Sequence, residues 1–338
     1  MNMPYRVSMK RAFLLAAAAL AIGTAAHAEP VKIGVSPVAS SGAVFVALEN
    51  GYFSEQGLEP TLVFFQAAQP VAVAAASGDI DFGSTALTAG FYTMAGQGIL
   101  KIIAAQSHEM PNYQSNAFIV SNKAYDAGFR RITDMSGHSV GVNAVGSSTH
   151  YSLGLMAEKY KVPLKSLKID PLQSFANQVS ALLGGQVDSI VIPSTIANPL
   201  VEKAQAHLIA YVGDETPWQI GALFTSTRMA DTNPGLTRRF LLAYKKGAAA
   251  FHDAFAGSHG KATSSPEAQK ILLILAKYTK QSAETLASSI PYMDPEERLD
   301  VADIHHQIAW YKAHHLLAPG IDPAKVIDSR YAVPLAGQ

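Results

Sequence analysis

Residues 31–65 read VKIGVSPVASSGAVFVALENGYFSEQGLEPTLVFF, and this stretch contains two β-rich runs with a helical segment between them. The runs 31–36 and 58–65 carry β-branched and aromatic side chains, which predicts strands. Residues 42–50 predict a helix that ends at Gly51. A strand, a helix and a second strand in this order are typical of a parallel sheet covered by helices. The stretch therefore predicts an α/β fold.

The same alternation continues along the chain and then restarts after Asp134. Before this residue we expect strands at 80–84 and 99–106 and helices at 70–77 and 86–95. After it we expect strands at 139–143, 167–171 and 189–192 and helices at 149–161 and 176–183. From Pro234 onward helical spacing dominates, with segments at 234–255, 266–278 and 295–315. The pattern predicts two α/β units in series, followed by a helical C-terminal region.

Two β-rich runs, 116–121 and 219–226, flank the second α/β unit. If these runs pair with each other, they form a two-strand hinge between two lobes. We therefore expect lobe I to comprise residues 29–116 and 223–338, and lobe II to comprise residues 117–222. A chain of 338 residues is long enough for two such cores.

The N-terminus has the three-part layout of a secretory signal peptide. Arg6, Lys10 and Arg11 precede an apolar run at 12–22, and Ala26-His27-Ala28 supplies a cleavage site before Glu29. The apolar run is too short to span a bilayer of roughly 30 Å as a helix. We expect a signal peptide at 1–28, cleavage after Ala28 and a protein exported to the periplasm.

Charge and cysteine content exclude several classes of function. The chain has 26 Lys and Arg against 26 Asp and Glu; the leader holds three of the basic residues and no acidic one, so the remaining 310 residues carry a net charge of −3. This balance argues against nucleic-acid binding. The chain has no cysteine, which excludes disulfides, thiolate metal sites and a cysteine nucleophile. An exported lipoprotein needs a cysteine for acylation at its cleavage site. Since the predicted leader is followed by no cysteine, we expect no lipid anchor.

Motifs for enzymatic or metal chemistry are weak. Residues 137–141, GHSVG, match the G-x-S-x-G elbow of serine hydrolases, but the expected strand follows Ser139 instead of preceding it. The pairs His305-His306 and His314-His315 are nine residues apart, which places them on different helix faces and predicts no metal site. No complete phosphate-loop or dinucleotide motif is present, so no cofactor is expected.

Small polar residues follow several predicted strands. Ser147, Ser148 and Thr149 lie between a strand and a helix, where hydroxyl groups cap the first turn and free backbone N–H groups can bind an anion. Comparable loops are 40–42, 66–69, 84–85 and 193–195. In a doubly wound sheet these loops meet at the carboxyl ends of the strands, where ligands bind.

Residues 47–58, ALENGYFSEQGL, resemble the A-x-E-x-G-Y-F-x-x-x-G-L signature of substrate-binding proteins of ABC importers, in the subfamily for nitrate, sulfonates, taurine and pyrimidine precursors. Further matches are SGDIDFG at 77–83, DMSGHSVG at 134–141, GGQVD at 184–188, HLLAP at 315–319 and VID at 326–328. The resemblance implies a type II periplasmic-binding fold of two doubly wound lobes joined by two hinge strands. It also implies a monomeric, non-enzymatic receptor that delivers its ligand to the transmembrane subunits of an ABC permease.

The resemblance also implies a set of pocket residues. By position these are Ser40, Ser41, Gln69, Ser84, Thr85, Ser147, Ser148, Thr149, His150 and Ser194, and Trp218 is expected either to close over the ligand or to pack in the core. We expect Ser147, Ser148 and Thr149 to bind an anion, with His150 adding a proton near neutrality.

The pocket loops contain no Lys or Arg, and Ile192-Pro193 stands where the family often has an acidic residue before the proline. Taurine and nitrate are therefore less suitable ligands than a small organic anion with an apolar body, an alkyl or aryl sulfonate or an aromatic carboxylate. The alternatives are a receptor for nitrate or a thiamine-pyrimidine precursor, an exported serine hydrolase built on Ser139, and a cytosolic pyrimidine synthase of the same fold, which the leader opposes.

Overall fold

Alternating buried positions in β1 (Glu29–Val35) show how the predicted strands assemble: the side chains of Val31, Ile33 and Val35 are buried, and Lys32 is exposed. The computed structural model describes residue 1, residues 28–256 and residues 264–337. Apart from Met1 and Ala28, the predicted signal peptide lies outside the described residues. Among the described residues, no helix is both long and apolar enough to cross a membrane.

The first sheet has five strands in the order β2-β1-β3-β10-β4. Besides β1 it contains β2 (Leu58–Phe64), β3 (Phe82–Ala86), β4 (Leu100–Glu109) and β10 (Trp218–Ser226). β1 runs parallel to β2 and β3, whereas β10 is antiparallel to β3 and β4.

The second sheet repeats this pattern, with the order β7-β6-β8-β5-β9. Its strands are β5 (Asn116–Ser121), β6 (Ser139–Val142), β7 (Lys168–Pro171), β8 (Ser189–Pro193) and β9 (Ala206–Tyr211). β6 is parallel to β7 and β8, and β5 is antiparallel to β8 and β9. In each sheet, three parallel strands are followed by an antiparallel strand in the fourth position.

The expected pairing between residues 116–121 and 219–226 is wrong. The first run is β5, which pairs with β8 and β9, and the second is β10, which pairs with β3 and β4. Each run inserts between two strands of its own sheet, where both of its edges find hydrogen-bond partners, and a two-strand hinge ribbon would leave the outer edges open. The chain crosses between the sheets twice, from β4 to β5 and from β9 to β10. The bounds of the two lobes as separate units stay a prediction.

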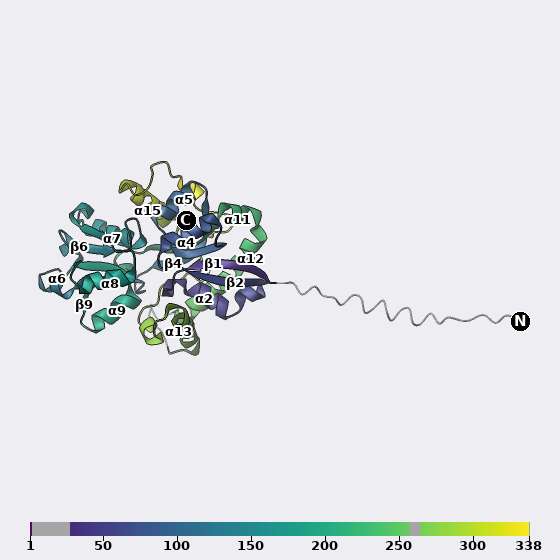
Figure 1. Ribbon diagram of the computed structural model, residues 1–338, viewed down its shortest axis with the longest axis horizontal. Coiled ribbons are helices and arrows are strands. Elements are labelled where there is room, and N and C mark those ends of the chain that lie inside the picture. Colours follow the sequence, from purple (N-terminus) through teal and green to yellow (C-terminus); the bar gives the residue numbers. More distant parts are fainter. Residues whose placement is uncertain (2–27, 257–263, 338) are drawn as a thin grey trace.

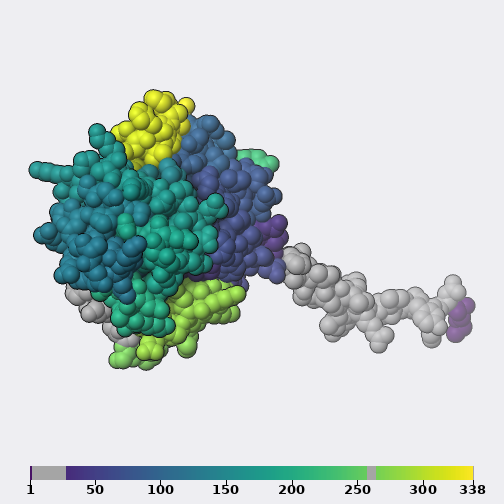
Figure 2. All heavy atoms as spheres, turned by 60° about the vertical axis from the view of Figure 1, so that its left-hand side comes forward, coloured from purple at the N-terminus to yellow at the C-terminus, as the bar shows by residue number. Residues whose placement is uncertain are grey.

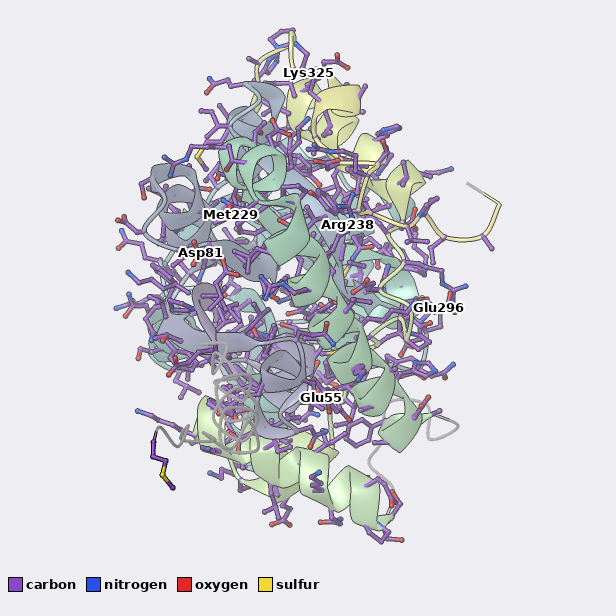
Figure 3. The ribbon with its side chains drawn as sticks, turned by 90° about the vertical axis from the view of Figure 1, so that its right-hand side faces the viewer. Glu55, Asp81, Met229, Arg238, Glu296 and Lys325 are labelled. Atoms are coloured by element: carbon purple, nitrogen blue, oxygen red, sulfur yellow. The ribbon has the colours of Figure 1, made fainter. Side chains whose placement is uncertain are left out.

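Helices cover both faces of each sheet (Figure 1). They are α2 (Gly42–Glu49), α3 (Tyr52–Glu55), α4 (Ala68–Ser77), α5 (Ala89–Gly96), α6 (Asn122–Asp126), α7 (Ser148–Lys159), α8 (Phe175–Leu183), α9 (Ser194–Glu202), α10 (Val212–Glu215), α11 (Thr227–Thr232), α12 (Pro234–Phe255), α13 (Pro266–Thr279), α14 (Ala283–Ala287) and α15 (Val301–Ala313). On one face of the first sheet, α2, α12 and α13 enclose one core. Figure 3 shows the long α12 on this side, beside Glu55 of α3, whose carboxylate pairs with Lys246 of α12 at 2.5 Å.

A second core is continuous between the two sheets. It includes side chains of α4 and α5 beside the first sheet, of α7 beside the second, and Trp310 and Tyr311 of α15. α15 packs closely on α7, since a Cβ atom added at Gly154 would lie 2.1 Å from the Trp310 ring. The C-terminal segment, yellow in Figure 2, accordingly lies against both the teal and the blue parts of the molecule. A third core lies under α8 and α9.

Candidate ligand-binding cleft

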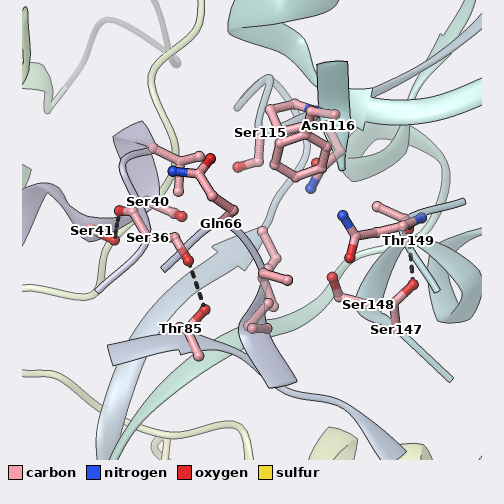
Figure 4. Close-up of a pocket in the computed structure, with 18 of the residues that line it drawn as sticks. Ser36, Ser40, Ser41, Gln66, Thr85, Ser115, Asn116, Ser147, Ser148 and Thr149 are labelled. Atoms are coloured by element: carbon pink, nitrogen blue, oxygen red, sulfur yellow. Dashed lines mark hydrogen bonds between the residues drawn. The ribbon is translucent and has the colours of Figure 1, made fainter. Parts of the chain in front are cut away.

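A cavity of about 680 Å³ lies where the carboxyl ends of parallel strands from both sheets meet. Ser36 and Gln66 follow β1 and β2, Thr85 lies near the end of β3, and Asn143 and Gln173 follow β6 and β7. Because parallel strands share a direction, their carboxyl ends lie at one edge of each sheet. The two such edges enclose the cleft. Figure 4 shows Ser36, Ser40, Ser41, Gln66 and Thr85 on one side of it and Ser147, Ser148 and Thr149 on the other.

The described residues that line the cleft are uncharged. Hydroxyl and amide side chains supply the polar groups, and the larger apolar lining residues are Val38, Val145, Phe175, Ile196 and Ile220. The volume lies within the range of roughly 300–1,000 Å³ that is typical of small-molecule sites, which combine apolar walls with a few placed polar groups.

Residues in the first turn of α4, α7, α8 and α9 line the cleft, among them Ala68, Ser148, Phe175 and Thr195. Each of these helices has at least eight residues, and α4 and α9 have no side-chain cap at their N-termini. The first backbone N–H groups of a helix lack partners within the helix and carry the positive end of its dipole. The arrangement therefore offers hydrogen-bond donors and a positive potential without any cationic side chain.

Seven of the residues expected in the pocket line the cleft: Ser40, Ser41, Gln69, Thr85, Ser147, Ser148 and Thr149. The serines and threonine at the start of α7 have different roles. The Ser147 hydroxyl caps the helix by accepting a bond from His150 N–H (3.3 Å), and Thr149 Oγ1 accepts one from Asn143 N–H (3.1 Å). Among the described residues, none bonds to the Ser148 hydroxyl, which is therefore the one available to a ligand.

Four expected pocket residues, Ser84, His150, Ser194 and Trp218, do not line the cleft. Ser84 is fully buried, and its hydroxyl accepts a bond from Gln106 Nε2 (3.0 Å). Neighbouring residues of a strand face opposite sides, and here Thr85 faces the cavity while Ser84 faces away from it. Ser194 is likewise fully buried beside Thr195, which lines the cleft.

His150 lies behind the α7 loop. Its Nδ1 accepts a bond from Gly146 N–H (3.0 Å), and its ring meets the Trp310 ring edge-on at 5.5 Å. Burial lowers the pKa of this imidazole to about 4, so the ring is neutral at neutral pH and does not supply the expected proton. Trp218 is a core residue that meets Tyr151 edge-on at 5.0 Å.

Several cleft residues were not predicted from the sequence. Asn143 and Gln173 follow strands in the same way as the predicted loop residues, so their position after a strand is a signal that marks them too. Gln106, Ser115 and Asn116 lie at or beside the first crossing between the sheets, and no local pattern marks them.

Ser139 does not lie in a hydrolase elbow. It begins β6, at the end of the strand away from the cleft, and its hydroxyl donates to Asp188 Oδ2 (3.1 Å). His138 Nδ1 lies 3.0 Å from the same carboxylate oxygen. Both side chains thus bond to Asp188, whereas a nucleophile requires the histidine to take the serine proton. Among the described residues, no cluster of three or more potential metal-ligating side chains is present.

The family model described as NMT1/THI5 like matches residues 39–254 of this chain. No protein of curated function matches the sequence. Among solved structures, the alkanesulfonate-binding protein SsuA from Xanthomonas axonopodis pv. citri, bound to MOPS, has a TM-score of 0.70 at 18% identity, covering 88% of this chain and 98% of that one.

Two further structures extend the comparison. The periplasmic nitrate-binding protein NrtA from Synechocystis PCC 6803 has a TM-score of 0.67 at 12% identity, covering 89% of this chain and 86% of that one. The desulfurization enzyme DSZB has a TM-score of 0.60 at 14% identity, covering 91% and 97%. These likenesses confirm the predicted two-lobed periplasmic-binding fold, which carries both binding proteins and an enzyme.

Proposed function

Because this chain belongs to the NMT1/THI5-like family, we propose that it is a periplasmic solute-binding receptor of an ABC importer that captures a small organic anion, an alkyl or aryl sulfonate or an aromatic carboxylate. In this role the cleft encloses the ligand, and the loaded receptor delivers it to the transmembrane subunits of a permease. The leader at 1–28 supports export to the periplasm.

The observation that carries the proposal is an uncharged cleft at which four helices begin. One helix N-terminus stabilises an anion by roughly 0.3–2 kcal/mol, and removing the charge from water costs several kcal/mol. Several donors must therefore converge on the anion. The N–H groups that begin α7 and the free Ser148 hydroxyl supply donors from the second sheet, and α4 supplies N–H groups from the first.

The apolar walls support a ligand with an organic body. Val38, Phe175, Ile196 and Ile220 would contact that body, and each Å² of apolar surface removed from water contributes about 25 cal/mol. Nitrate has four atoms and no apolar part, so it would leave most of the 680 Å³ unfilled.

A neutral heteroaromatic ligand, such as a thiamine-pyrimidine precursor, is the second candidate. Amide side chains favour it, because they can donate to and accept from ring nitrogens and exocyclic groups without a charge. The amides that line the cleft are Gln66, Gln69, Gln106, Asn116, Asn143, Gln173 and Gln281.

We propose binding without covalent chemistry. The cleft side chains of the described residues are hydroxyl, amide or apolar groups, and none of these is a general base at neutral pH.

A thermal-shift screen tests the proposal with ethanesulfonate, benzenesulfonate, benzoate, nitrate and 4-amino-5-hydroxymethyl-2-methylpyrimidine. A ligand at 100 times its Kd adds about 2.7 kcal/mol to the free energy of unfolding, so we expect the aromatic anions to raise the Tm. A shift with the pyrimidine alone would favour the second candidate. No shift with any of the five compounds would contradict both.

A further inference from the structure

In three amide side chains of the cleft wall, the nitrogen donates a hydrogen bond to another group of the protein. This bond fixes the orientation of the amide and so decides which atoms it can offer a ligand. The three side chains are those of Gln106 near the end of β4, Asn116 at the start of β5 and Asn143 after β6. An amide has two N–H donors at one end and an acceptor oxygen at the other, so a bond from the protein to one end fixes the orientation of both.

Glu109 fixes the orientation of Asn116. The Asn116 Nδ2 group donates to Glu109 Oε1 at 2.6 Å, and Glu109 is the last residue of β4, with an exposed fraction of 0%. Burial raises the pKa of this carboxyl to about 8, and a protonated carboxyl still accepts through its carbonyl oxygen. One Nδ2 N–H is therefore engaged, and Oδ1, to which no described residue donates, is the acceptor that Asn116 can offer a ligand.

Gln106 and Asn143 have the same arrangement. Gln106 Nε2 donates to the buried Ser84 Oγ at 3.0 Å, and Asn143 Nδ2 donates to the Gln173 carbonyl at 3.3 Å. Within the described part of the chain, no donor bonds to Gln106 Oε1, Asn116 Oδ1 or Asn143 Oδ1. The wall therefore presents three acceptor oxygens.

Other cleft groups are donors. Gln69 Oε1 accepts a bond from the Thr88 hydroxyl at 2.7 Å, which leaves the Gln69 amide N–H groups for a ligand. The Ser148 hydroxyl and the start of α7 lie across the cavity from Ser40 and Ser41, and Asn116 lies between these two sides (Figure 4). A ligand with acceptors alone would satisfy the donors and leave the amide oxygens unpaired.

We propose that the ligand is an organic anion that also carries an N–H or O–H donor, and that Asn116, oriented by Glu109, accepts a hydrogen bond from it. The inference rests on the proposed function and narrows its substrate class to anions that carry an uncharged amino, amido or hydroxyl group, since no described cleft residue is charged to pair with an ammonium group. Leaving a buried acceptor unpaired costs more than a hydrogen bond contributes, so a site built in this way rejects analogues that lack the donor.

Isothermal titration calorimetry with two matched anions tests this inference. The probes are 4-aminobenzenesulfonate and 4-methylbenzenesulfonate, which have the same charge and nearly the same shape and differ in the N–H donor. We expect the amino compound to bind at least fivefold more tightly. Equal affinity, or tighter binding of the methyl compound, overturns the inference and leaves the proposed function intact. No binding of either compound overturns the proposed ligand class and the inference with it.

Variants separate the positioning role of Glu109 from a merely structural one. Glu109→Gln keeps an acceptor for Asn116 Nδ2, so the preference for the amino compound should persist. Glu109→Leu removes the acceptor, so the affinities for the two compounds should differ by less than twofold. Asn116→Leu should also abolish the preference, and it gives the answer if Glu109→Leu fails to fold. The control Ser148→Ala should weaken the binding of both compounds by the same factor. A preference that persists in Asn116→Leu overturns the inference.

Discussion

At the residue scale, Ser147 and Ser148 are adjacent and have different roles. Ser147 accepts bonds from two backbone N–H groups, those of Ala144 and His150, and so caps α7. Ser148 has a hydroxyl that no described residue engages, at the wall of the cleft.

We expect Ser147→Ala to lower the free energy of unfolding by about 1 kcal/mol, the typical cost of a lost N-cap. Ser148→Ala should leave the Tm within a degree of wild type and weaken ligand binding about fivefold, the equivalent of one hydrogen bond. Urea unfolding and calorimetry measure the two quantities. If both variants lost affinity and neither changed the free energy of unfolding, the assignment of Ser147 to capping and Ser148 to ligand binding would be contradicted.

The same pair shows what the sequence can predict about single residues. A run of small hydroxyl residues between a strand and a helix predicted a ligand site at 147–149, and these three residues line the cleft. It could not separate the cap from the free hydroxyl, because that depends on the backbone angles of the loop. At Ser84-Thr85 the loop pattern could not tell which residue faces the cavity, because that depends on where the strand ends.

At the scale of elements, the contact between α7 and α15 joins the second sheet to the C-terminal region. Gly154 of α7 lies directly against the Trp310 ring, and Tyr151, one turn earlier, has its hydroxyl 2.6 Å from His306 Nδ1 of α15. The glycine permits this close approach.

We expect Gly154→Ala to lower the free energy of unfolding by about 1–3 kcal/mol, because the new methyl group would overlap the indole ring. The matched control is Gly235→Ala in α12, where a Cβ atom meets nothing within 4 Å. There the same change should be neutral or stabilising, since alanine favours a helix over glycine. Equal effects of the two changes in thermal or urea unfolding would show that the α7–α15 contact is loose.

α9, β9 and several short helices were not predicted from the sequence. The other strands and helices of the two α/β units followed from alternation and turn residues, and so did the existence of β5 and β10. Their partners did not, because an apolar pattern reports which face of a strand is buried and carries no information on which strand lies beside it. The residues of the cleft near the crossing, Gln106 and Asn116, depend on that pairing and were missed for the same reason.

At the scale of the whole molecule, buried carboxyl and imidazole groups set the pH dependence of stability. Burial raises the pKa of Glu109 and of Glu297 to about 8, above the ordinary value of 4.5. Burial lowers the pKa of His108 and His150 to about 4, below 6.5. As the pH falls from 6.5 to 4, the two histidines bind protons in the unfolded chain and not in the folded one, so the free energy of unfolding falls. The carboxyls stabilise the fold fully below pH 4.5, and this contribution is lost as the pH rises towards 8.

Between pH 6.5 and 8 the two histidines are neutral in the folded chain and lose their remaining charge in the unfolded chain, which raises the free energy of unfolding slightly, but the larger change at the two carboxyls dominates. We expect the free energy of unfolding to fall over this interval by on the order of 2 kcal/mol, as the unfolded chain binds fewer protons than the folded one. Urea unfolding at several pH values measures the slope, and Glu297→Gln should reduce it by about half. A stability that rises from pH 6.5 to 8 would contradict these assignments.

The export of the chain is a further prediction at this scale. If residues 1–28 are removed at the inner membrane, the protein recovered from the periplasmic fraction should begin at Glu29 with the sequence EPVKIG. N-terminal sequencing of that fraction checks this. An uncleaved chain found in the cytosol would instead favour an intracellular role for the same fold.

The position of β10 has a consequence for how the protein is made. The strands of the second sheet, β5 to β9, are contiguous in the chain, whereas β10 completes the first sheet from a point after all of them. Until residues 218–226 have been synthesised and are free to fold, β3 and β4 each lack the neighbour that covers an edge. The second sheet can therefore form while the first is still incomplete, and a chain that ends before residue 218 would expose one open edge of β3 and an unpaired β4 to neighbouring molecules.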